Sequence, residues 1–130
     1  MMRIGFLPSD FNPMLLMLGE AEDFRALAGV LRGFARQPDD VRLDTLGFCA
    51  PTRTQLLLTA TAGPGGVQPH PDGLFVWRID TARAAGFAEK VDSLAETARV
   101  AGSELLECSL EDEIPVKLSR GEYTDDFLQV

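Results

Sequence analysis

Two stretches of the chain carry hydrophobic residues at steps of three and four, which is the period of an amphipathic helix. The first spans residues 19–38, where acids at the start and arginines near the end match the sign of the helix dipole. The second spans residues 79–102, where Asp80 or Thr81 can cap the start and Gly102 can end the helix. Each apolar stripe is expected to face the core. The stripes are Phe24, Leu27, Ala28, Leu31, Phe34 and Ala35 in the first helix, and Phe87, Val91, Leu94 and Ala98 in the second.

Short runs rich in leucine, β-branched and aromatic residues, bounded by proline or glycine, predict the strands. They are MRIGFLP, MLLML, VRLDTLGF, TQLLLTATA, GLFVWRID, SELLECS and IPVKLS. The three runs between the helices suggest an antiparallel meander, and residues 63–73, GPGGVQPHPDG, predict an exposed loop.

The predicted order of elements is β-β-α-β-β-β-α-β-β. This order favours an α+β fold, a two-layer sandwich in which a mostly antiparallel sheet carries two helices on one face. At 130 residues the chain is long enough for one core and too short for two, so residues 1–130 are expected to be a single α+β domain. No period of 20 to 50 residues recurs, and no linker divides the chain.

Trp77 alternates with Phe75 and Ile79, so these three side chains share one face of their strand. If the helices cover that face, Trp77 belongs to the core, and this is the interpretation we favour. If they cover the other face, the three residues form an exposed apolar stripe that would serve a partner or a second copy.

The formal charge of −8, from 20 acids and 12 bases, disfavours nucleic-acid binding and a polybasic membrane anchor. It favours a basic protein as partner. The chain starts with MMRIGFLPSD rather than a basic stretch followed by a long apolar run, so we expect no membrane segment and a cytoplasmic location. Two cysteines without C-x-x-C spacing fit that expectation, and both lie in strand-like runs where cysteine packs as a small hydrophobe.

Half of the net charge lies near the C-terminus, because residues 111–130 hold six acids and two bases. Residues 119–130 form an acidic tail that combines charge with aromatic contact area. The candidate binding residues of this tail are Glu122, Tyr123, Asp125, Asp126 and Phe127. Either the two rings pack on the sheet and leave the acids in water, or the tail is a recognition surface for a basic partner.

Motifs for catalysis are absent from the sequence. The single histidine, His70, lies between two prolines with Asp72 nearby, and no G-x-S-x-G elbow, P-loop or G-x-G-x-x-G motif accompanies it. The doublets Asp39-Asp40 and Asp125-Asp126 do not predict a catalytic carboxylate pair, because adjacent strand residues point to opposite faces. We therefore expect no metal and no cofactor, and His70 with Asp72 are only secondary candidates for a site.

Three functions remain. The leading hypothesis is a small acidic interaction protein, of the inhibitor or immunity type, that binds a basic protein surface without catalysis. The first alternative is a small-ligand binder or enzyme that uses carboxylates near the Gly63–Gly73 loop. The second alternative is a homo-oligomeric structural subunit, in which a sheet face or edge pairs with its own copy.

Overall fold

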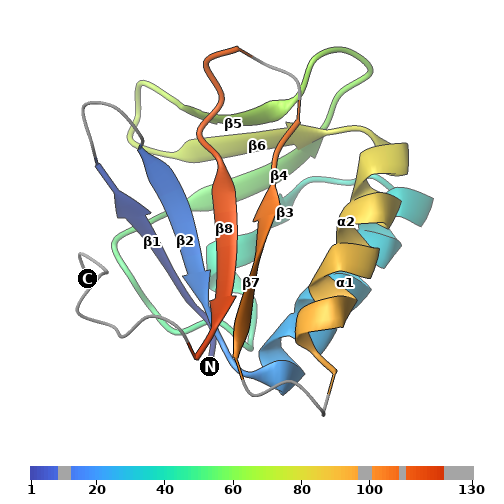
Figure 1. The fold of residues 1–130 in the computed structure, drawn as a ribbon. Helices are drawn as coiled ribbons and strands as arrows, with labels where there is room; N and C mark the ends of the chain where they lie inside the picture. The colour runs from blue at the N-terminus through green and yellow to red at the C-terminus, as the bar shows by residue number, and fades with distance from the viewer. Residues whose placement is uncertain (9–12, 97–100, 109–110, 122–130) are drawn as a thin grey trace.

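Two four-stranded sheets and two helices make up the protein in the computed structural model, which describes residues 1–8, 13–96, 101–108 and 111–121 (Figure 1). The first sheet has the order β1-β2-β8-β7 and the second the order β3-β4-β6-β5. The first consists of β1 (Arg3–Leu7), β2 (Met14–Leu18), β8 (Val116–Arg120) and β7 (Gly102–Leu106). The second consists of β3 (Val41–Arg42), β4 (Leu56–Ala60), β6 (Phe75–Ile79) and β5 (Gly66–Pro69). The helices are α1 (Ala21–Arg36) and α2 (Thr81–Leu94), and a short 3-10 helix, η1 (Leu43–Thr45), follows β3.

The predicted α+β class is confirmed, and the arrangement of the strands differs in detail. They divide between two mixed sheets, each with a central parallel pair, β2 with β8 and β4 with β6. The expected meander is wrong, because β4 and β6 run parallel. Their connection contains β5, which pairs antiparallel with β6 inside the stretch predicted as a loop. The glycines and prolines of that stretch suggested a loop. β5 is an edge strand, however, and edge strands tolerate proline.

Both helices form where the period predicted them. Asp80 caps α2, and its carboxylate accepts a hydrogen bond from the backbone N–H of Arg83 at 2.7 Å. The predicted end of this helix is wrong, because α2 ends at Leu94 and Gly102 opens β7 instead. Ala98 of the predicted stripe lies outside the described residues.

The two halves of the chain repeat one plan. Each half has the order strand, strand, helix, strand, strand, and α2 begins at Thr81, 60 positions after Ala21 begins α1. Each half exchanges two strands with the other, so β7 and β8 join β1 and β2, while β3 and β4 join β5 and β6. The register agrees: Leu15 pairs with Val116 in the first sheet, and the residues 60 positions away, Phe75 and Leu56, pair in the second. The molecule therefore consists of two β-β-α-β-β units related by a pseudo-twofold axis.

The buried faces of the helices follow the same repeat. The buried apolar residues of α1 each have a buried counterpart in α2, 60 positions later. The pairs are Phe24 with Ala84, Leu27 with Phe87, Ala28 with Ala88, Leu31 with Val91, and Phe34 with Leu94. The ion pair that links the two helices, Arg32 with Asp92, also joins residues 60 positions apart. The helices therefore meet where a pseudo-twofold axis would pass between them.

One hydrophobic core joins both helices and the inner faces of both sheets. Trp77 is 1% exposed and stacks on Phe87 with ring centroids 6.0 Å apart, so the core interpretation of its strand face is confirmed. Phe75, at the start of the same strand, packs against Phe6 with centroids 4.8 Å apart. Within the described residues, no helix is long and apolar enough to cross a membrane.

Candidate functional site

His70 and Asp72 lie in the hairpin turn that joins β5 to β6. His70 Nδ1 is 2.9 Å from a carboxylate oxygen of Asp72, and both side chains are at least half exposed. The same carboxylate accepts a hydrogen bond from the backbone N–H of Leu74 at 3.0 Å. This bond, and then the contact with His70, lower the pKa of Asp72. Both side chains thus take part in the local structure of an exposed turn.

The acidic tail proposed from the sequence is largely outside the described residues, and this applies to Glu122, Tyr123, Asp125, Asp126 and Phe127. Its first two residues, Ser119 and Arg120, belong to β8. Gly121 follows with φ of 76°, a left-handed conformation that glycine adopts without strain. The chain therefore leaves the sheet at Gly121, two residues after the predicted start of the tail.

The titratable side chains of the described ranges do not converge on a metal site, since no group of three or more His, Cys, Asp or Glu lies together there. Cys49 is buried in the core, and Cys108 is partly buried beside it. Burial, together with nearby carboxylates, raises the pKa of each thiol to about 11. Both cysteines therefore stay protonated at neutral pH and act as packing residues.

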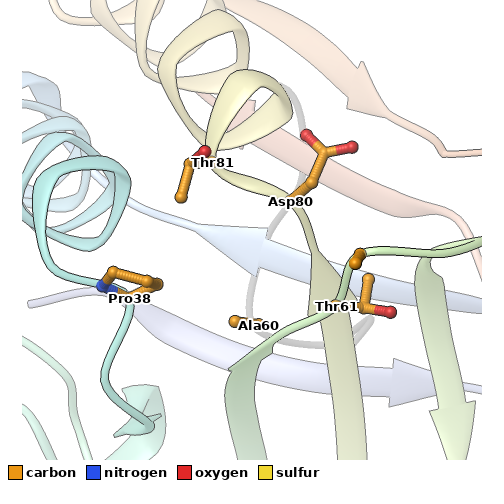
Figure 2. A pocket seen from close by; sticks show the side chains of 6 residues that line it. Pro38, Ala60, Thr61, Asp80 and Thr81 are labelled. Atoms are coloured by element: carbon orange, nitrogen blue, oxygen red, sulfur yellow. The ribbon is translucent and has the colours of Figure 1, made fainter.

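A hollow of about 400 Å³ opens where three connections meet (Figure 2). It lies beyond the carboxyl ends of the parallel strands β4 and β6 and beside the segment that leaves α1. Pro38 stands on one side, with Ala60 and Thr61 across from it and Thr81 at the start of α2 (Figure 2). The lining residues are Pro38, Ala60, Thr61, Ala62, Asp80 and Thr81.

The hollow is open because its lining side chains are small and its backbone is fixed. The N–H of Thr61 donates to the carbonyl of Ile79 at 3.1 Å, which holds the end of β4 against the end of β6. The hydroxyl of Thr61 accepts a hydrogen bond from the N–H of Gly63 at 3.2 Å, so the chain turns away there. Alanine at positions 60 and 62 leaves the space between these connections unfilled.

Acidic residues occur in the lining of this hollow and next to it in the sequence. Asp80 is part of the lining, and Asp39 and Asp40 follow directly after Pro38. Asp40 is anchored, because the hydroxyl of Thr59 donates to its carboxylate at 2.6 Å. The α1 C-terminus adds the negative end of a helix dipole, although the exposed Arg36 lies in the same last turn. A mostly apolar lining that includes one acidic residue, Asp80, suits the aliphatic stem and charged end of a lysine or arginine side chain.

This site was missed in the sequence, because alanine, threonine and proline carry no chemical signature. His70 and Asp72 do not contribute to it: they precede Phe75 at the start of β6, while Asp80 follows its end. Five strand residues separate the two places by roughly 17 Å. The sequence analysis considered Asp39 and Asp40 only as a candidate catalytic pair, and it rejected that interpretation.

Comparison of the chain with protein-family models, with curated proteins and with solved structures finds no match.

Proposed function

We propose that this chain is a small cytoplasmic interaction protein that binds a basic protein surface through the hollow beside α1. The observation that carries this proposal is an open, mostly apolar lining that includes Asp80, with Asp40 two residues after the lining residue Pro38. The net charge of −8 supports it, because a negatively charged chain attracts a basic partner and speeds the encounter.

The proposed surface differs from the one that the sequence alone favoured. The tail residues remain candidates for contact with the same partner. The hollow, however, combines shape with charge on backbone that strand and helix ends hold in place, and specific recognition needs both.

The test removes charge at the hollow while keeping its hydrogen bonds. Asparagine caps helices nearly as well as aspartate, so Asp80→Asn preserves the start of α2, and Asp40→Asn preserves an acceptor for Thr59. The matched control, Glu22→Gln with Glu89→Gln, changes the net charge equally at exposed positions of the two helices. The probe is a fluorescently labelled octa-lysine peptide, whose affinity is measured by fluorescence anisotropy at several salt concentrations.

We expect the Asp40→Asn, Asp80→Asn double variant to weaken binding by about tenfold and to reduce its salt dependence, because it loses two nearby charges. The control pair should change the affinity by less than about threefold. Equal weakening by both pairs would mean that only the net charge attracts the peptide, and the proposal would then be wrong.

A further inference from the structure

The C-termini of the two helices occupy equivalent places in the pseudo-twofold, but within the described part of the chain arginine side chains bind the carbonyls of only one of them. A helix leaves its last carbonyls without partners inside the helix. At the end of α2, Arg120 donates from Nη1 to the carbonyl oxygens of Leu94 and Glu96, each at 2.8 Å. Arg25, from α1, donates from Nη2 to the carbonyl oxygen of Ala95 at 3.1 Å. Two guanidinium groups thus cover the negative end of α2.

At the end of α1 the equivalent residues are alanines. Position 60, which is 60 before Arg120, is Ala60, and position 85, which is 60 after Arg25, is Ala85. The N–H of Gln37 reaches the carbonyl of Gly33 at 2.9 Å. Among the described residues, no donor outside the helix is bonded to the carbonyl oxygens of Phe34, Ala35 or Arg36. The hollow lies where Ala60 replaces the arginine of the other half.

We infer that the hollow is a binding site for an arginine side chain of the basic partner, seated as Arg120 is seated against α2. The inference rests on the proposed function and adds to it the residue that is recognised. Three features fit a guanidinium group. The last carbonyls of α1 have no bonded donor from outside the helix among the described residues, Asp80 is part of the lining with Asp40 two residues after Pro38, and Ala60 and Ala62 leave space for the aliphatic stem. A guanidinium group offers five donors in a planar fork, which suits several acceptors better than the single ammonium of lysine.

The experiment titrates the full chain with acetyl-Gly-Arg-Gly-amide and follows backbone amide signals by NMR. The matched probe is the same peptide with citrulline, which keeps the shape of the side chain and lacks its charge. We expect the arginine peptide to shift the amide signals of Thr61, Ala62 and Thr81, and the citrulline peptide to bind at least tenfold more weakly.

Two variants locate the site. Ala60→Arg copies Arg120 and should fill the hollow from within the chain, so the peptide-induced shifts should be lost. Gln55→Arg adds the same charge at an exposed position before the other end of β4 and should leave them unchanged. The amide spectra of the two variants show whether each of them is folded. Equal binding of the two peptides, absence of shifts around the hollow, or shifts that persist in Ala60→Arg would overturn the inference.

Failure here can be separated from failure of the proposed function. If octa-lysine still binds and depends on Asp40 and Asp80, while the arginine peptide does not reach the hollow, the proposed function stands and the arginine inference falls. If octa-lysine binding is also independent of Asp40 and Asp80, both are wrong.

Discussion

The outer face of the first sheet and the outer face of the second sheet occupy equivalent places in the two halves, and their burial differs. In the first sheet, Leu18 and Ser119 are only 2% and 1% exposed. Their counterparts in the second sheet, Arg78 and Thr59, are half-buried. Leu16 and Leu18 form a hydrophobic cluster separate from the main core, with Leu7 packed against them.

The sequences of the central strands explain this difference. β2 reads MLLML, so both of its faces are apolar, and its last four residues are buried. β6 reads FVWRI, and its outer face carries Val76, which is buried like its counterpart Leu16, and the half-buried Arg78. A continuous apolar run is typical of a strand that is covered on both faces, whereas a polar residue at alternate positions marks a face that meets water. The repeated fold therefore permits two kinds of surface, and the outward-facing side chains decide between them.

The largest expected effect comes from truncating the two outer faces at equivalent positions. Leu18→Ala should lower the free energy of unfolding by about 2–5 kcal/mol, because it removes a buried leucine and leaves a cavity. Arg78→Ala should change it by about 0.5 kcal/mol, as is usual for a partly exposed position. Urea unfolding of both variants and the wild type measures the two differences.

Similar losses for the two variants would contradict the comparison. A small loss for both would show that Leu18 faces solvent in solution, and a large loss for both would show that the arginine stem is as important for packing as the leucine.

The ends of the helices give the next comparison, with a smaller effect. Arg120→Ala should lower the free energy of unfolding by about 1–3 kcal/mol, because two carbonyls at the end of α2 lose a charged donor. Ala60→Arg, the reverse change at α1, should raise it by up to about 1 kcal/mol. Thermal and urea unfolding measure both. A loss of stability in Ala60→Arg would mean that the hollow cannot seat a guanidinium group.

Local periodicity predicted most helices and strands, but it could not predict which strands pair with each other. Helix stripes such as Phe24 to Phe34 follow directly from the step of three and four, and Trp77 was assigned to the core from alternation. Which strands become neighbours depends on the exchange between the halves, and a single strand's pattern does not encode its partner. β5 was missed because its glycine and proline also suit a turn.

The repeat and the hollow were missed for related reasons. The repeat has a period of 60 residues, which is longer than the 20 to 50 residues typical of stacked repeats, and paired positions such as Ala60 and Arg120 hold different side chains. Ala60 and Arg120 look unrelated until the structure aligns them. The hollow exists because its lining residues are small. The sequence signal for it is alanine at position 60 where the other half has Arg120, and this difference can be recognised only after the two halves have been aligned.

The smallest expected effect distinguishes the β3–β4 connection from the β7–β8 connection, each of which holds a carboxylate that accepts a backbone hydrogen bond. Asp44 accepts from the N–H of Leu56 at 2.9 Å, and Glu113 accepts from the N–H of Cys108 at 2.8 Å. Burial works against ionisation of Asp44, but hydrogen bonds from Arg42 and Leu56 outweigh it and lower the pKa of Asp44 below its ordinary 3.8. Burial raises the pKa of Glu113 above its ordinary 4.5, against the bond from Cys108 and with help from Glu107.

The two groups should therefore affect stability in opposite directions as the pH changes. A lowered pKa means that the contribution of Asp44 is present above about pH 4 and is lost as the pH falls through the native pKa. A raised pKa means that the contribution of Glu113 is complete below about pH 4.5 and is lost as the pH rises through the native pKa. Each effect should be less than about 1 kcal/mol, the scale of partly exposed charged pairs.

Asp44→Asn and Glu113→Gln remove one titration each, and urea unfolding between pH 3 and pH 7 measures the result. The stability difference between wild type and Asp44→Asn should shrink as the pH falls below 4, because the wild type then loses the ionised pair with Arg42. For Glu113→Gln, the wild type should lose stability relative to the variant as the pH rises above 4.5. If both differences had the same sign of pH dependence, Glu113 would have a charged partner in solution equivalent to Arg42, and the contrast between the two connections would be wrong.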